Sequence, residues 1–207
     1  MSKKMVLVML VIALLIPSVL FAKTFSLGLG GVAMYNVKAS EVFNDNSAFT
    51  KLENYNFGAD VRLKVLLLDV TAMGLYNGKS SAEGAGTEEM KEISGIVTAG
   101  LAFDLMDMIR VGVGIGPRLR ALTSDWKDWK VYQNGAQIDS NNFGDVLKNA
   151  PMTYRAMVDL MLGNLSVGLS YMVDTKYTFN DPKEVKNLVN CDWDSGKLGV
   201  SLLFNLQ

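Results

Sequence analysis

The residues of this sequence that could do chemistry are charged side chains at every second position of otherwise apolar stretches. In the segment 108–122, Arg110, Arg118 and Arg120 share the even positions with three glycines, whereas the odd positions are apolar. Successive side chains of a β-strand point to opposite faces, so a period of two predicts a strand with one charged and one apolar face. The charged face could form ion pairs or line a narrow path for water and small anions.

Catalytic chemistry is poorly supported. The sequence contains no histidine, which removes the usual general base for a serine nucleophile and the commonest zinc ligand. No spacing of Asp and Glu suggests a paired-carboxylate hydrolase. The glycines at 28, 30 and 31 are not a nucleotide loop, because no helical pattern follows them. We therefore expect neither an enzyme nor a bound cofactor or metal.

Seven further stretches alternate in the same way, so the sequence predicts an all-β protein, an eight-stranded antiparallel up-and-down β-barrel. An even strand number is typical of bacterial single-chain membrane barrels. The expected strands cover about 25–36, 55–67, 70–76, 93–103, 108–122, 152–162, 165–176 and 197–206.

The size of side chains indicates which face is inside. An eight-stranded barrel has just enough interior for side chains to fill it, and glycines beside the arginines leave volume for them. The Ile, Val and Leu side chains of the other face are bulky and suit the convex side. An apolar exterior and a charged interior are the pattern of a barrel in a lipid bilayer.

This orientation predicts a charge network in the lumen. A base turned towards lipid at mid-depth would cost ~2–4 kcal/mol, so the register is strongly specified. We expect a mostly filled interior. The bases predicted inside are Arg62, Lys64, Arg110, Arg118, Arg120, Arg155 and Lys176, and the acids are Asp60, Asp159 and Asp174.

Some predicted inward positions are apolar. They can pack the lumen below the charged layer, or they can line a conduit for small hydrophobic molecules. These positions are Val32, Met34, Ile96, Met157, Met161 and Met172.

The connections alternate between short and long. Short turns are expected near Asp69, across 104–107 and at 163–164, and long polar loops over 38–54, 78–92, 123–150 and 178–195. Such an alternation matches a transmembrane barrel with a turn side and a loop side. Exposed aromatic residues favour interfaces, so the third loop offers the best candidates for contact with a partner: Trp126, Trp129, Tyr132 and Phe143. The alternative is that these aromatic side chains cap the barrel mouth.

The beginning of the chain predicts export. Lys3 and Lys4 precede an apolar run over 5–16 and a short segment that ends at Ala22, the pattern of a secretory signal peptide. The expected organisation is a signal peptide over 1–22 and a barrel domain over 23–207. Cys191 is the one cysteine, so no internal disulfide is possible.

Taken together, these strands, loops and the amphipathic final strand resemble the small eight-stranded outer-membrane barrels of bacteria: the OmpA transmembrane domain, OmpX-like and OmpW-like proteins. The resemblance implies location in the outer membrane of a Gram-negative type envelope, contact with its lipid, and insertion by the barrel-insertion machinery. It implies a structural or surface-contact role, with an extracellular ligand or host surface as possible partner of the loops. An OmpW-like relationship would imply instead a narrow pore for small hydrophobic or anionic molecules. Acyltransferases, deacylases and phospholipases of this architecture use a histidine, which this chain lacks.

Two further expectations can be checked in the structure. A secreted lipocalin-like barrel would share the strand number but would turn its apolar face inward around a ligand. Pro117 stands within a strand, and since proline cannot donate a hydrogen bond to a neighbour, we predict a local irregularity there.

Near-neutral net charge, with 20 basic and 21 acidic residues, gives no reason to expect nucleic acid as a partner. We expect a monomer.

Overall fold

The computed structural model describes residues 24–35, 51–80, 90–105, 107–133, 136–138 and 143–206. The predicted signal peptide and most of the first long loop lie outside the described residues. None of the helices within the described ranges has the length and apolarity needed to span a bilayer.

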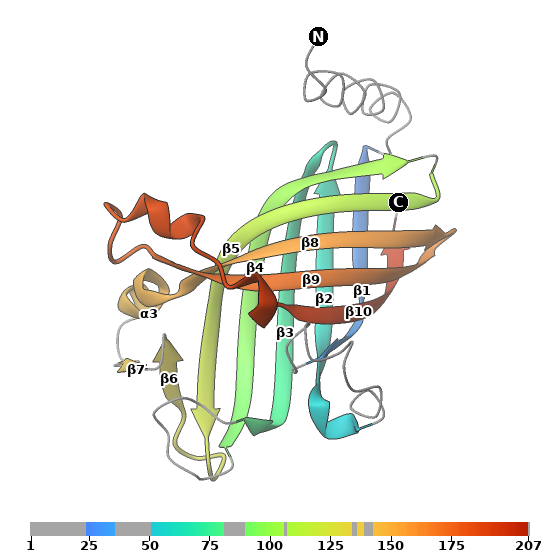
Figure 1. The fold of residues 1–207 in the computed structure, drawn as a ribbon. Helices are drawn as coiled ribbons and strands as arrows, with labels where there is room; N and C mark the ends of the chain where they lie inside the picture. Colours follow the sequence, from blue (N-terminus) through green and yellow to red (C-terminus); the bar gives the residue numbers. More distant parts are fainter. Residues whose placement is uncertain are drawn as a thin grey trace.

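Eight long strands form a closed antiparallel barrel. Each pairs with the next along the chain, β10 pairs with β1, and pairing of β4 with β5 completes the ring. In Figure 1, β8, β9 and β10 cross the ribbons of β1, β2 and β3 at a steep angle, as opposite walls do when strands tilt ~35–45° from the barrel axis. The strands are β1 (Phe25–Tyr35), β2 (Tyr55–Val65), β3 (Leu68–Ser80), β4 (Met90–Leu105), β5 (Ile109–Thr123), β8 (Pro151–Leu162), β9 (Leu165–Thr178) and β10 (Lys197–Leu206).

The predicted fold class is therefore confirmed, and so is the direction of the faces. Val113 on β5 is 59% exposed and Leu169 on β9 is 61% exposed, whereas Arg110, on the opposite face of β5 from Val113, is 2% exposed. A lipocalin-like barrel would have the opposite arrangement and is excluded by these positions. The many exposed apolar side chains of the strands give the barrel an apolar outer surface, as in barrels that lie in lipid.

The register places glycines beside the inward charges. Gly28 is paired with Arg62 across β1 and β2, and Gly114 is paired with Arg155 across β5 and β8. A glycine has no side chain to compete for the interior, so the neighbouring arginine can extend across the lumen. This is the arrangement that the glycine and arginine alternation of β5 predicts.

The boundaries of the third strand differ from the prediction. β3 begins at Leu68, and the turn before it is formed by Leu66 and Leu67, with Leu66 at φ 56. The expectation of a turn near Asp69 is therefore wrong: Asp69 is 5% exposed and lies on the inner face of β3. The polarity of its side chain suggested a turn, but its buried neighbours provide partners for it.

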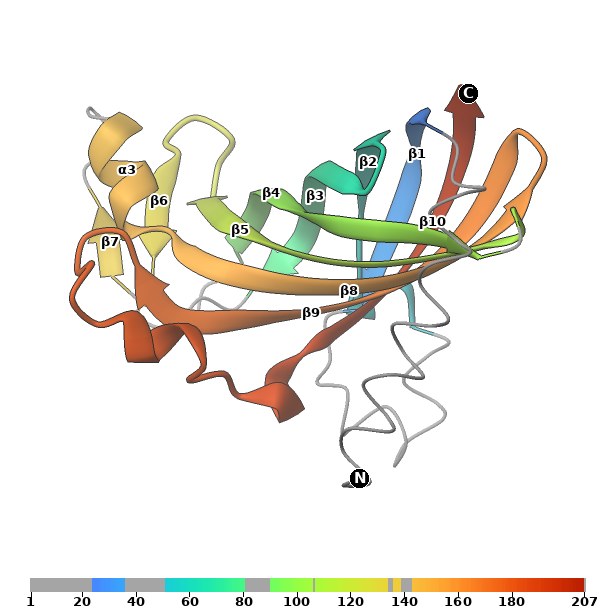
Figure 2. The same ribbon diagram turned by 90° about the horizontal axis from the view of Figure 1, so that it is seen from above.

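The third long loop contains more regular structure than the sequence analysis expected. β6 (Lys130–Gln133) pairs with the end of β5, β7 (Ala136–Ile138) pairs with β6, and α3 (Phe143–Asn149) precedes β8. Figure 2 shows these three elements together at one end of the barrel. Short 3-10 turns lie before β2 and in the fourth loop: η2 (Leu52–Asn54), η3 (Val185–Leu188) and η4 (Trp193–Ser195).

Pro117 marks an interruption of the sheet, as predicted. The pairing of β4 with β5 includes Ile96 with Arg118 and Ala99 with Ile115, but not the positions between them. On the other side of β5, pairing with β8 ends at Pro117. The strand continues beyond the proline by pairing with β6 instead.

Candidate functional site

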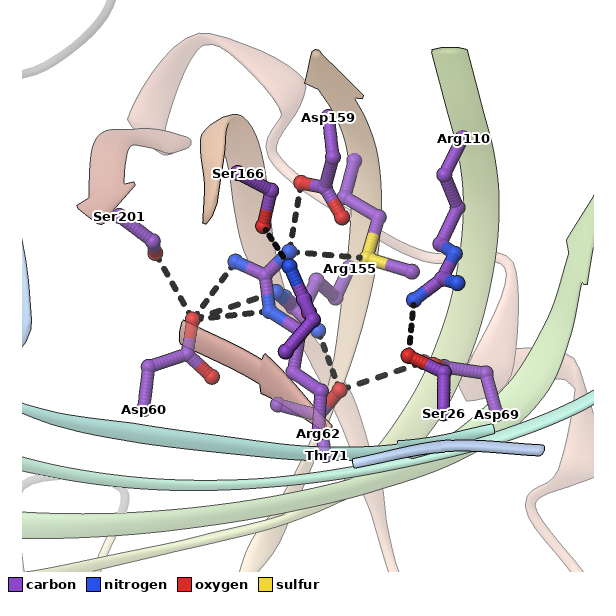
Figure 3. Close-up of polar contacts among 12 residues, drawn as sticks. Ser26, Asp60, Arg62, Asp69, Thr71, Arg110, Arg155, Asp159, Ser166 and Ser201 are labelled. Carbon is purple, nitrogen blue, oxygen red and sulfur yellow. Dashed lines mark hydrogen bonds and ion pairs between the residues drawn. The ribbon is translucent and has the colours of Figure 1, made fainter. Parts of the chain in front are cut away.

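The polar interior next to the short turns holds a group of charged residues that we call the inner charge cluster. Among the described residues it contains four bases and four acids, so its formal charges balance. Figure 3 shows how several of these side chains converge from different strands. The members are Asp60, Arg62 and Lys64 of β2, Asp69 of β3, Asp104 of β4, Arg110 of β5, and Arg155 and Asp159 of β8.

Arg62 joins opposite walls of the barrel. Its guanidinium contacts Asp60 on the same strand at 2.6 Å and Asp159 on β8 at 2.6 Å. Three strands separate β2 from β8 in either direction around the ring: β1, β10 and β9 on one side, and β3, β4 and β5 on the other. All three side chains are at most 1% exposed. This ion pair therefore crosses the lumen.

A second ion-pair group lies close to the turn side. The Asp104 carboxylate receives hydrogen bonds from Lys64 Nζ at 2.6 Å and from Arg110 Nε at 2.7 Å. Arg110 also donates to the Ser26 hydroxyl at 3.4 Å. These contacts link β2, β4, β5 and β1 at one level, so side chains from half of the wall meet there.

Arg155 connects the inner charge cluster to β3. Its guanidinium donates to the Thr71 hydroxyl, which in turn donates to Asp69 at 3.2 Å. A second guanidinium nitrogen lies 3.7 Å from Asp60. Ser201 of β10 donates to the same Asp60 at 2.8 Å, so the contacts of the cluster extend to β10 as well (Figure 3).

An apolar layer separates this cluster from the loop side. Its position differs from the expectation of packing below the charges, because it lies between two charged groups. On β4, Ile96 stands between Glu92 and Asp104, both of which point inward. The layer consists of Val32, Met34, Met73, Leu75, Ile96 and Met172. Met157 and Met161 are also buried, but outside this layer.

The second charged group, which we call the outer charge cluster, lies towards the long loops and consists of Glu92, Arg118, Arg120, Asp174 and Lys197. Arg120 binds Glu92 through two hydrogen bonds of 2.9 and 2.8 Å. Arg118 binds Asp174 at 2.9 Å and lies 3.6 Å from Glu92. Thr153 also donates a hydrogen bond to Asp174.

Nine of the ten predicted lumen residues lie in these two clusters. Lys176 does not: it is exposed and makes no part of the network. The reason is that β10 begins at Lys197, opposite Met172, so β9 at position 176 has already left the closed part of the barrel. The register of β8 and β9 also shifts between Asp174 and Thr178, and beyond this point Thr175 is buried whereas Lys176 is exposed.

Four charged members of the clusters were missed: Asp69, Glu92, Asp104 and Lys197. The first three were assigned to turns or loops because polar residues near strand ends favour turns. A signal for two of them was present in the sequence. Glu92 and Asp104 continue the even-numbered inward positions of the fourth strand by two residues at each end.

The predicted loop contacts have different environments. Trp126 is 51% exposed, stacks on Tyr76 with ring centroids 5.7 Å apart, and receives Lys91 over its ring at 4.8 Å. Trp129 packs edge-on against Trp126. Phe143 is 67% exposed at the start of α3. Tyr132 is buried with Met90 and Leu122, so its assignment as a contact candidate is wrong, because pairing of β6 with β5 covers it.

The described residues contain no group of three or more His, Cys, Asp or Glu side chains arranged to hold a metal ion. The chemistry available in the lumen is ion pairing and hydrogen bonding between side chains. The fold and the apolar outer face together define a small eight-stranded β-barrel of the outer-membrane type.

Comparisons with known proteins give weak similarities of fold. No protein-family model and no curated protein matches the chain. Among solved structures, the chain is similar to Ail, the attachment invasion locus protein of Yersinia pestis, with 13% identity and a TM-score of 0.42 over 88% of this chain and 97% of that chain. One structure of Ail contains the heparin analogue sucrose octasulfate. Neisserial surface protein A shows 10% identity and a TM-score of 0.40 over 88% of this chain and 96% of that chain. The class given above rests on the geometry of the barrel and not on these values.

Proposed function

We propose that this protein is a closed outer-membrane barrel whose role is structural and surface contact, with a lumen that does not conduct. The ion pair between Arg62 and Asp159 is the observation that carries the proposal, because it joins opposite walls at 2.6 Å. The apolar layer on the loop side of this pair adds an apolar barrier to water and ions. A barrel closed in this way can anchor loops at the cell surface.

The loops are the part of the molecule available for contact with an extracellular ligand or host surface. α3 carries Phe143, and the fourth loop carries Val185 and Val189, which are 56% and 79% exposed. Their backbones are joined, since Asn180 donates a hydrogen bond to the Lys148 carbonyl. Figure 1 shows α3 and the fourth loop next to each other. Exposed apolar side chains of this kind favour protein contacts.

Single-channel recording in planar bilayers tests the closed lumen. The wild-type protein should give a silent membrane. Arg118→Ala should be silent as well, because that substitution leaves the inner charge cluster intact. Steady discrete openings of the wild type, changed in size by Arg118→Ala, would overturn the proposal.

A second candidate function is a narrow pore for small hydrophobic molecules. The apolar layer of Val32, Met34 and the other four residues is the observation that favours it. Uptake of an apolar fluorescent probe into protein-containing vesicles distinguishes the two functions. A closed barrel should give the same uptake as protein-free vesicles, and faster uptake would favour the pore.

A further inference from the structure

The outer charge cluster holds one more positive than negative charge. Arg120 and Glu92 neutralise one another through two hydrogen bonds. Arg118 and Asp174 neutralise one another at 2.9 Å. Lys197 lies close enough to be attracted by both Glu92 and Asp174. It is the one base of this cluster whose side chain makes no direct hydrogen bond or ion pair with the described residues.

A second donor in the same place also lacks a partner. Arg118 is 6% exposed, and its Nε has no hydrogen-bond acceptor within the described residues. A buried donor without a partner is costly, and more so when it belongs to a charged group. Both features indicate that a negatively charged group is missing from this cluster.

Lys197 and Arg118 line the same pocket at the loop side of the lumen. Its walls also include Thr153, Asn56 and Ser195, and the apolar layer supplies several of its other lining residues. Asp174 lies in this wall too, but its two carboxylate oxygens are occupied by Arg118 and Thr153. The volume of the pocket is about 30 Å³, which is the share of one water molecule in the liquid.

We propose that this pocket binds one small monovalent anion of the size of chloride, between Lys197 and Arg118. One negative charge neutralises the cluster, and the anion accepts hydrogen bonds from Lys197 Nζ and Arg118 Nε. The small volume of the pocket favours a small anion. The site is independent of the closed lumen, because the inner charge cluster lies beyond the apolar layer.

Bromide is the probe that tests the site. Crystals of the protein grown without halide and then soaked in sodium bromide should show an anomalous peak between Lys197 Nζ and the Arg118 guanidinium. In solution, chloride should raise the thermal unfolding midpoint of the detergent-solubilised barrel relative to gluconate at equal ionic strength, because gluconate is a much larger anion than chloride.

Lys197→Met should weaken the chloride effect about tenfold in concentration, as expected for loss of a charge-assisted contact. Lys176→Met is the matched control, since that lysine lies at the same end of the barrel but is exposed, and it should respond to chloride as the wild type does. Heat-modifiable migration in gels shows that each variant is folded. Absence of the anomalous peak, or equal chloride responses of all three proteins, would overturn the proposal.

Discussion

The residues of the inner charge cluster differ in how many buried charges would lose their partner if one residue were replaced. Arg62 forms ion pairs with two carboxylates, those of Asp60 and Asp159, and both carboxylates are buried from solvent. Removing one member of a buried ion pair leaves an uncompensated charge, which costs much more than the pair itself contributes. The consequence is that the middle of this network should tolerate substitution least.

Arg62→Met should destabilise the barrel by about 3–5 kcal/mol, because two buried carboxylates lose their main partner. Urea unfolding of the protein in lipid vesicles measures the change. Lys148→Met provides the control, since its 3.7 Å pair with Asp145 has side chains 62% and 52% exposed, and exposed pairs contribute about 0–1 kcal/mol. Equal unfolding free energies for the two variants would contradict this account of the lumen.

Asp125 in the third loop is predicted to titrate at a lower pH than an ordinary aspartate. Backbone N–H groups of Lys127 and Asp128 donate to its carboxylate at 3.0 and 3.2 Å, and these bonds lower its pKa below the usual 3.8. A lowered pKa means that the ordered turn is favoured above that usual value and is lost as pH falls through the pKa of the folded state. Carboxyl NMR titration, assigned with Asp125→Asn, checks this. A pKa at or above 3.8 would be inconsistent with the turn.

Most inward charged residues could be predicted from the sequence, because the alternation of inward and outward side chains is a local property of each strand. It did not reveal which bases and acids pair. Arg62 and Asp159 are 97 positions apart, and their contact depends on how far the two walls are displaced around the ring. Lys176 shows where this alternation is not sufficient, because the environment of its side chain also depends on where the neighbouring strand β10 begins.

At the level of strands, close backbone approach makes some glycines essential and leaves others free. A Cβ at Gly58 on β2 would stand 1.8 Å from the carbonyl oxygen of Gly74 on β3. A Cβ at Gly74 would meet nothing within 4 Å. The two glycines are one position out of register, so they share a strand pair but differ in the space around them.

Gly58→Ala should therefore destabilise the barrel by about 1–3 kcal/mol, as overpacking does, because the backbone of β3 must move. Gly74→Ala should be neutral or slightly stabilising, since alanine restricts the unfolded chain. Thermal or urea unfolding in the same lipid compares the two. The opposite order of stability would show that the register of β2 and β3 is different from that described.

The strands could be predicted because apolar and polar residues alternate within each of them. Pro117 allowed the interruption in the pairing of β5 to be predicted as well. The ends of strands and the structure of the third loop were not predictable in the same way. β6 depends on the free edge of β5 beyond Pro117, which appears only when β8 ends its pairing there. Asp69 is linked through Thr71 to Arg155 of β8, and a contact between strands so far apart in the chain is not visible in the local sequence around Asp69.

At the scale of the whole molecule, the two rims differ in their accessible basic residues. The fourth loop carries Lys183, which is exposed, and Lys186, whose side chain is 77% exposed. At the opposite rim Lys64 is fully buried. Loops at the cell surface should therefore be cut by a protease added outside, whereas the turn side should not.

Trypsin added to intact cells should cleave the protein in the fourth loop, and Lys183→Gln with Lys186→Gln should abolish that cut. The membrane-embedded strands should stay uncut. Cleavage that occurs only after the cells are broken would place the long loops on the inner side of the membrane and contradict the orientation.

The most direct test of the central claim is a nitroxide scan in lipid vesicles, with single cysteines placed in a Cys191→Ser background at two neighbouring positions of β8 and two of β9. Labels at Val158 and Leu169 should collide readily with dissolved oxygen and poorly with a water-soluble nickel reagent. Labels at Met157 and Ser170 should be shielded from both reagents. The reverse pattern, or access of the nickel reagent to Met157 and Ser170, would contradict an apolar face in lipid around a filled interior.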